Sequence, residues 1–108
     1  MAQILLKDAI ATGAGAAWQE RDKSAPFNYV YHSFQAIGNV TASTGAATVL
    51  IQVSNDGVNY LTLGTIGLTL GTAATSDGFA AANNWQYYRA NVSAISGTNA
   101  KVTVYMKG

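Results

Sequence analysis

The sequence predicts an all-β fold, a small antiparallel β-sandwich or jelly roll of about 7–8 strands with an N-terminal arm or edge hairpin. Three observations predict it. Apolar residues alternate with a period of two in several short runs. Clusters of Gly, Asn, Asp and Ser separate these runs at a spacing of roughly ten residues. Small residues dominate, since Ala, Gly, Thr and Ser occupy 48 of the 108 positions, a composition typical of β-rich modules with tight turns.

The first 26 residues differ from the remainder in their charge. They hold six of the eleven charged residues, whereas residues 27–108 hold five. A Gly/Ala stretch at 12–17 and the boundary at Pro26 indicate an arm or an edge hairpin over residues 1–26, followed by a β-sandwich domain over residues 27–108. An extended arm can add a strand to the open edge of a neighbour. The residues expected to carry this assembly role are Ile4, Leu5, Leu6, Ile10 and Trp18.

The domain contains several stretches with the residue pattern of β-strands, at 27–37, 46–53, 60–70, 85–95 and 101–107. In the third stretch, Gly64 and Gly67 indicate bends or bulges, so this stretch forms either one strand or two short ones. Helix content should be low, because Gly and β-branched residues interrupt every window long enough for a helix. The three alanines at 80–82 predict at most one helical turn.

A tight turn is predicted where the second of these stretches ends, at the sequence SNDG of residues 54–57. Asn55, Asp56 and Gly57 tolerate positive φ at little steric cost and therefore set the turn. Tyr60 is placed to cover its end. Arg89 stands alone among uncharged neighbours, so we expect it to pair with a carboxylate or to cap loop carbonyls and to stabilise the fold.

We expect no enzyme activity, no cofactor, and no catalytic, metal-binding or cofactor-binding residues. The chain has no Cys, which excludes disulfides, thiolate metal sites and a cysteine nucleophile. His32 lies in an aromatic strand, where a packed histidine is expected rather than a base. Asp56 and Asp77 each precede a Gly and are expected to shape turns. A carboxylate pair of the glycosidase type and a calcium site are the alternatives to that interpretation.

Neither nucleic acid nor a membrane is an expected partner. Six Lys and Arg residues against five Asp and Glu give a net charge of +1, which provides no cationic face for phosphates. The first residues lack the basic region of a secretory signal. Gly, Ser, Thr or Asn interrupts every apolar stretch before it reaches the roughly 18 residues that a membrane-spanning helix needs.

The low charge of residues 27–108 favours a protein that works in contact with permanent neighbours. Five charges in 82 residues lie far below the roughly 25% typical of soluble domains. Protein interfaces are depleted in Lys, Glu and Asp and enriched in Tyr, Trp and Met. A small neutral monomer kept in solution by Thr and Asn is the alternative.

Exposed aromatic residues could instead stack on sugars. This second interpretation makes the chain a carbohydrate-binding or host-adhesion module. Ordinary packing at the ends of strands is the simpler account of such aromatic residues. The candidate glycan-stacking set is Asn83, Asn84, Trp85 and Tyr87.

Three segments resemble known families. Residues 49–60 (VLIQVSNDGVNY) resemble the strand, turn and aromatic residue of discoidin-like, galactose-binding-type sandwiches, and residues 85–92 (WQYYRANV) are similar to the aromatic strand of the same folds. Together with residues 93–104 (SAISGTNAKVTV), they more closely resemble small virion proteins of tailed bacteriophages.

This resemblance implies a structural virion protein, most simply a capsid decoration or cement protein that binds the head lattice and its own copies. For the alternative, a carbohydrate-binding or host-adhesion module, it implies a place in a phage tail or fibre. The implied partners are the major capsid protein or another virion protein, and further copies of this chain in a homo-oligomer such as a trimer. The implied location is the virion, at the capsid surface in preference to the tail, after synthesis in the host cytoplasm.

Overall fold

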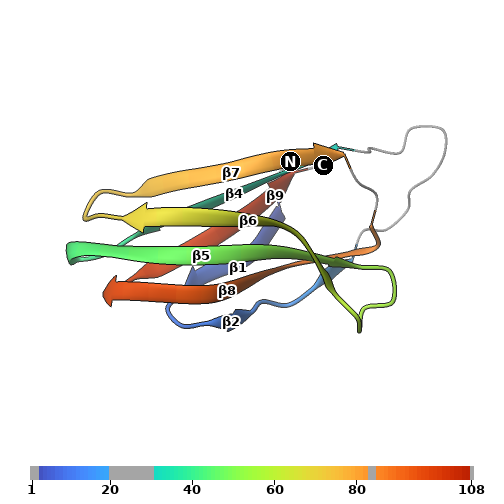
Figure 1. Cartoon of the computed structure of the whole chain (residues 1–108), viewed down its shortest axis with the longest axis horizontal. Coiled ribbons are helices and arrows are strands. Elements are labelled where there is room, and N and C mark those ends of the chain that lie inside the picture. Colours follow the sequence, from blue (N-terminus) through green and yellow to red (C-terminus); the bar gives the residue numbers. More distant parts are fainter. Residues whose placement is uncertain (1–2, 20–30, 83–84, 108) are drawn as a thin grey trace.

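The computed structural model describes residues 3–19, 31–82 and 85–107, which form two antiparallel sheets packed as a β-sandwich (Figure 1). This confirms the predicted all-β class. Sheet A has the order β1-β9-β4-β7 and sheet B has β8, β5 and β6 in that order, with β2 and β3 both beside β8. Their bounds are β1 Gln3–Ala9, β2 Gly13–Ala14, β3 Trp18–Gln19, β4 Tyr31–Asn39, β5 Ala42–Ser54, β6 Leu61–Leu70, β7 Thr75–Ala82, β8 Tyr87–Thr98 and β9 Lys101–Lys107.

The short elements β2 and β3 act as one interrupted edge strand. Gly13 of β2 pairs with Val92, and Trp18 of β3 pairs with Tyr88, both on β8 and both antiparallel. Counted in this way, the sandwich has two sheets of four strands, within the predicted range. The described residues form no helix, and hence none long and apolar enough to cross a membrane.

The core lies between the two sheets and follows from the alternation in the sequence. On β9, and on β5 from Ala47 to Val53, every second side chain points inward and is almost fully buried, while its neighbours are more exposed. Burial of apolar surface contributes about 25 cal/mol per Å², so this period of two is what holds the sheets face to face. The largest buried apolar side chains are Tyr88, Phe34, Ile51, Ile66, Leu70 and Met106.

The first segment of the chain runs along both sheets. β1 is an edge strand of sheet A and pairs with β9, where Gln3 lies opposite Met106. The chain then crosses to sheet B, where β2 and β3 border β8. Residues 3–19 therefore contribute one edge to each sheet. The expected domain boundary at Pro26 lies outside the described residues.

The expected helical turn at residues 80–82 is wrong, because these alanines belong to β7. Ala80 pairs with Ser33 and Ala82 with Tyr31 on the neighbouring β4. Ala favours helix only weakly as a local preference, and pairing with a formed strand overrides it. This strand is absent from the sequence-based assignment.

The stretch at residues 60–70 forms the single strand β6, with one irregularity. Its register with β5 shifts between Ile51, which pairs with Gly64, and Gln52, which pairs with Thr62. Gly64 faces the core, and a Cβ there would clash with the ring of Phe79. Gly64 is therefore the position at which sheet B makes room for an aromatic side chain of sheet A.

Candidate interaction surfaces

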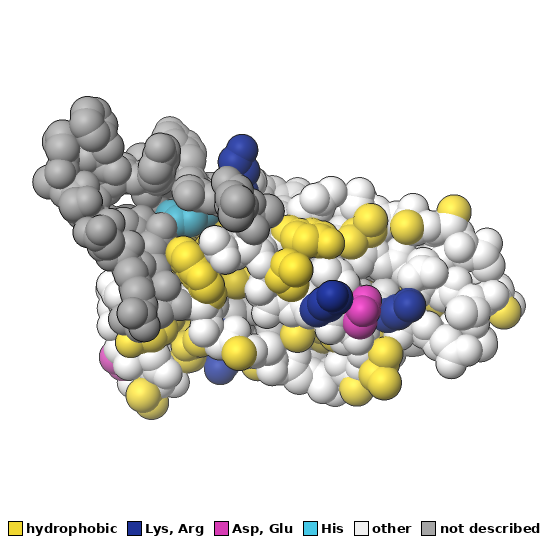
Figure 2. Space-filling view, turned by 180° about the vertical axis from the view of Figure 1, so that it is seen from behind, with side chains coloured by type: hydrophobic (Ala, Val, Ile, Leu, Met, Phe, Trp, Pro, Cys, Tyr) yellow, Lys and Arg dark blue, Asp and Glu magenta, His cyan; other side chains and the backbone are white. Residues whose placement is uncertain are grey.

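Charge is divided unequally between the two sheets. Among the described residues, the strands of sheet B carry one formally charged side chain, Arg89, whereas those of sheet A carry Lys7, Asp8, Asp77, Lys101 and Lys107. Figure 2, which looks onto the sheet A side, shows Lys or Arg side chains beside an Asp or Glu side chain. We call the outward-facing residues of β5, β6 and β8 the sheet B face.

The sheet B face is built from uncharged side chains that alternate with the core. On β5, Thr48, Leu50 and Gln52 lie between the buried residues 47, 49, 51 and 53. On β6, Thr65 is exposed between two core-facing positions and pairs with Leu50. The result is a face of hydroxyl, amide and aliphatic groups, which costs little to desolvate compared with a charged one.

The single cation of this face is satisfied by its own neighbours. Arg89 pairs with Gln52 across β8 and β5, and its Nε donates a hydrogen bond of 2.8 Å to Gln52 Oε1. Its guanidinium lies 3.8 Å from the centre of the Tyr60 ring, in a cation–π contact. The expected carboxylate or carbonyl partner is thus replaced by an amide oxygen and an aromatic ring.

The SNDG turn is held by a network centred on Asp56. Asp56 Oδ1 accepts from the backbone N–H groups of Val58 and Asn59, each at 2.8 Å, and Oδ2 accepts from the Asn59 amide at 2.8 Å. These bonds, led by the N–H of Asn59 and then that of Val58, hold the pKa of the Asp56 carboxyl well below its usual value. Gly57 has a φ of 74°, a backbone conformation that glycine adopts without steric cost.

A second set of bonds fastens this turn to the sandwich. The buried Ser54 hydroxyl donates to Asp56 Oδ1 at 2.7 Å and accepts from the N–H of Gly57 at 3.0 Å. Asn55 Oδ1 accepts from the N–H of Gln86 at 3.2 Å, just before β8 begins. The turn is therefore a rigid projection from the end of sheet B.

The candidate glycan-stacking residues are only partly placed. Asn83 and Asn84 lie outside the described residues. Trp85 is half-buried and packs against the core, while its backbone N–H donates to Tyr88 Oη at 3.0 Å. Tyr87 is half-buried, and its ring lies so close to Gly57 that a Cβ there would be 3.2 Å from it. Both aromatic rings thus make contacts within the domain.

His32 is a buried residue in the described structure. Its side chain is 1% exposed, and its Nδ1 lies 3.5 Å from Tyr88 Oη. Its ring lies 4.8 Å from that of Tyr88 and 6.5 Å from that of Phe34, centre to centre. No group of three or more His, Asp or Glu side chains gathers to form a candidate metal site within residues 3–19, 31–82 and 85–107.

The apolar residues expected to form the arm divide into two groups. Leu5 is buried, and Leu6 and Trp18 pack against the core. Ile4 and Ile10 remain exposed, at 52% and 74%. The first three are therefore occupied within their own sandwich, and only the last two are free for a contact with another molecule.

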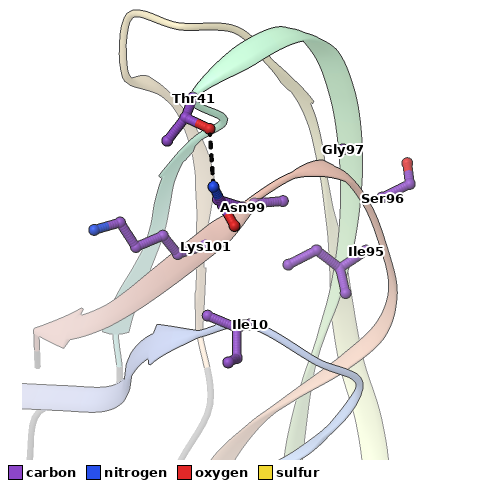
Figure 3. Close-up of a pocket in the computed structure, with 8 residues that line it drawn as sticks. Ile10, Thr41, Ile95, Ser96, Gly97, Asn99 and Lys101 are labelled. Carbon is purple, nitrogen blue, oxygen red and sulfur yellow. Dashed lines mark hydrogen bonds between the residues drawn. The ribbon is translucent and has the colours of Figure 1, made fainter.

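A hollow of about 470 Å³ opens where β8 turns into β9 (Figure 3). Ile10, which directly follows β1, and Ile95 of β8 both line it, and Lys101 lies at its margin. Thr41 Oγ1 accepts a hydrogen bond of 3.2 Å from Asn99 Nδ2, which closes one side.

Three contributors to these surfaces were not singled out from the sequence. Gln52 could have been suspected from the alternation of β5, which places it outward, but its partner depends on the register with β8. Val58, 78% exposed, comes directly after the predicted turn, and its position there is the signal that could have indicated its exposure. Ile95 had no such signal, because the hollow combines residues from distant parts of the chain.

Comparison with known proteins identifies the fold. The structure is similar to the crystal structure of the exported protein XepA of PBSX, a phage-like element, with a TM-score of 0.51 and 14% sequence identity. The similarity covers 98% of this chain and 36% of that one, so the chain spans about a third of XepA. At this identity the likeness concerns the β-sandwich fold. No protein-family model and no curated protein sequence matches the chain.

Proposed function

We propose that the chain is a non-enzymatic structural protein of a tailed-phage virion, of the capsid decoration or cement type, and that it packs through the sheet B face. The observation that carries this proposal is the single formal charge on the strands of sheet B, Arg89, which already engages Gln52 and Tyr60. Interface cores are depleted in Lys, Asp and Glu, because an unpaired charge is costly to desolvate.

Two further observations support this proposal. The fold resembles part of a protein exported by a phage-like element. The sheet B face is also preorganised, since its strands are paired on both sides of β5 and its cation is held by two partners. A preformed face loses little conformational entropy when it binds. Many such modest contacts on a lattice add up through a high effective concentration.

β1 is not required for assembly in this proposal. An extended arm could have added a strand to a neighbour, but β1 pairs with β9 of its own chain. The proposed partners are the major capsid protein or another virion protein, together with further copies of the chain, and the proposed location is the virion surface.

Binding to phage particles tests the proposal. The purified chain is mixed with particles that lack it, and the bound fraction is measured by co-sedimentation. Thr65→Lys places a cation on the sheet B face, and Ser33→Lys places the same side chain at an exposed position of sheet A. We expect Thr65→Lys to reduce binding at least tenfold and Ser33→Lys to leave it unchanged.

Equal binding by both variants would overturn the role of the sheet B face. A glycan array separates the carbohydrate-binding alternative: specific binding of a sugar, lost in Trp85→Ala at unchanged melting temperature, would favour that function over the structural one.

A further inference from the structure

The two ends of the sandwich carry different features. The described part of the molecule measures 49 × 25 × 17 Å. The hollow lies at the end where β8 passes into β9, and the SNDG turn projects from the opposite end, where β5 passes into β6 (Figure 1). A feature at one end therefore cannot meet the feature at the other end within one molecule.

The lining of the hollow includes the apolar side chains of Ile10 and Ile95. These two residues belong to separate segments of the chain (Figure 3). Ile10 is 74% exposed, which is high for an isoleucine in a folded domain. Lys101 lies at the margin of the hollow, and its ammonium group points away from the other lining residues (Figure 3).

The opposite end offers an apolar projection. Val58 is 78% exposed at the turn, and Leu61, the first residue of β6, is 60% exposed. The bonds of Asp56 hold the backbone N–H of Val58 and of Asn59, each at 2.8 Å. A side chain on such a fixed turn can be buried with little loss of backbone entropy.

The two ends are also complementary in size and in charge. A hollow of about 470 Å³ has room for a valine side chain. The ionisable residue that lines the hollow is Lys101, and the ionisable residue of the turn is Asp56. A rim pair of opposite charge contributes orientation and association rate more than affinity.

From this complementarity we propose that the chain binds a second copy of itself head to tail, with Val58 of one molecule seated between Ile10 and Ile95 of the next. Asp56 of the first molecule then lies toward Lys101 of the second. This inference rests on the proposed structural function and specifies one of its partners. The contact is heterologous, so each added molecule presents a new hollow or a new turn, and the assembly either closes into a ring or continues as a row.

Engineered cysteines test the contact directly, because the chain has none of its own. Val58→Cys and Ile10→Cys are prepared separately, mixed at millimolar concentration and oxidised mildly. We expect a mixed disulfide dimer in the mixture and no dimer above background from either variant alone, since a heterologous contact brings position 58 only to position 10. Val58→Cys mixed with Ser33→Cys is the matched control.

Sedimentation of variants without cysteine provides an independent measurement. Val58→Lys is expected to weaken self-association at least tenfold, which corresponds to about 1.4 kcal/mol. Ile4→Lys, at another exposed isoleucine outside both ends, is expected to associate like the original chain. Melting temperatures check that both variants are folded.

The contact is overturned if the mixture of Val58→Cys and Ile10→Cys yields no more dimer than the Ser33→Cys control. It is equally overturned if Val58→Lys associates as strongly as the original chain, or if the original chain stays monomeric at millimolar concentration. None of these results concerns the binding of Thr65→Lys to particles, so failure of the head-to-tail contact is distinguishable from failure of the proposed function.

Discussion

Replacing Gly64 with alanine tests how the two sheets meet at Phe79. An added Cβ would clash with Phe79 Cζ and lie 2.9 Å from both Cε1 and Cε2, whereas carbon atoms prefer a separation of about 3.5–4.0 Å. The ring must therefore retreat by roughly 1 Å. Phe79 packs against the buried Phe34, at 5.2 Å between ring centres, which resists that movement.

Overpacking of this kind costs about 1–2 kcal/mol, and each kcal/mol lowers the Tm of a domain of this size by about 4–8 °C. We therefore expect Gly64→Ala to lower the Tm by about 4–16 °C. Gly67→Ala on the same strand is the control, because a Cβ there meets nothing within 4 Å. That variant should be neutral, or more stable by up to about 1 kcal/mol.

Thermal unfolding of the two variants and of their combinations with Phe79→Ala measures this coupling. In the Phe79→Ala background, Gly64→Ala should cost little, since the atoms that it overlaps are gone. An unchanged cost in that background, or equal melting temperatures for Gly64→Ala and Gly67→Ala, would refute the steric argument.

Three further predictions concern stability. Leu5→Ala should lower the free energy of unfolding by about 2–3 kcal/mol because Leu5 is buried, whereas Ile4→Ala should change it by less than about 0.5 kcal/mol. Urea titration compares the two variants, and equal losses of stability would contradict the packing of β1. Arg89→Ala should cost about 1–2 kcal/mol, since it removes the bond to Gln52 and the cation–π contact; an unchanged melting temperature with lost particle binding would show that Arg89 serves binding instead. The pKa of Asp56 is lowered by the N–H groups that it accepts, so its contribution to stability is present above its usual pKa of about 3.9 and is lost as the pH falls below that value. The Tm of the original chain should therefore fall more steeply below about pH 4 than that of Asp56→Asn, and parallel curves would exclude this contribution.

Strands that bury one face were predictable from the sequence. β5, β8 and β9 each place β-branched or aromatic residues at alternate positions, which is the pattern that a half-buried strand requires. The SNDG turn was predictable for a similar reason, because the hydrogen bonds of its Ser54 and Asp56 side chains join residues at most three positions apart. Local chemistry determines both features.

Features that depend on pairing could not be derived in this way. β7 has little alternation in its alanines, and it becomes a strand because β4 supplies its partner. The partner of Arg89 depends on the register of β5 with β8, which shifts between Thr48 and Val49. The hollow joins Ile10 to Ile95 across most of the chain. Predicting each of these features requires the position of a segment that is distant in the sequence, and local residue patterns do not give that position.

The place of β9 in sheet A governs when the molecule can fold during synthesis. Of the described strands, it emerges last from the ribosome, yet it lies between β1 and β4 and joins them through hydrogen bonds on both sides. Until β9 has been synthesised, β1 and β4 lack the strand that joins them in sheet A. Pairing between segments that are far apart in the sequence is slow. A chaperone that shields β1 and β4 before β9 pairs with them should therefore raise the yield of recombinant protein.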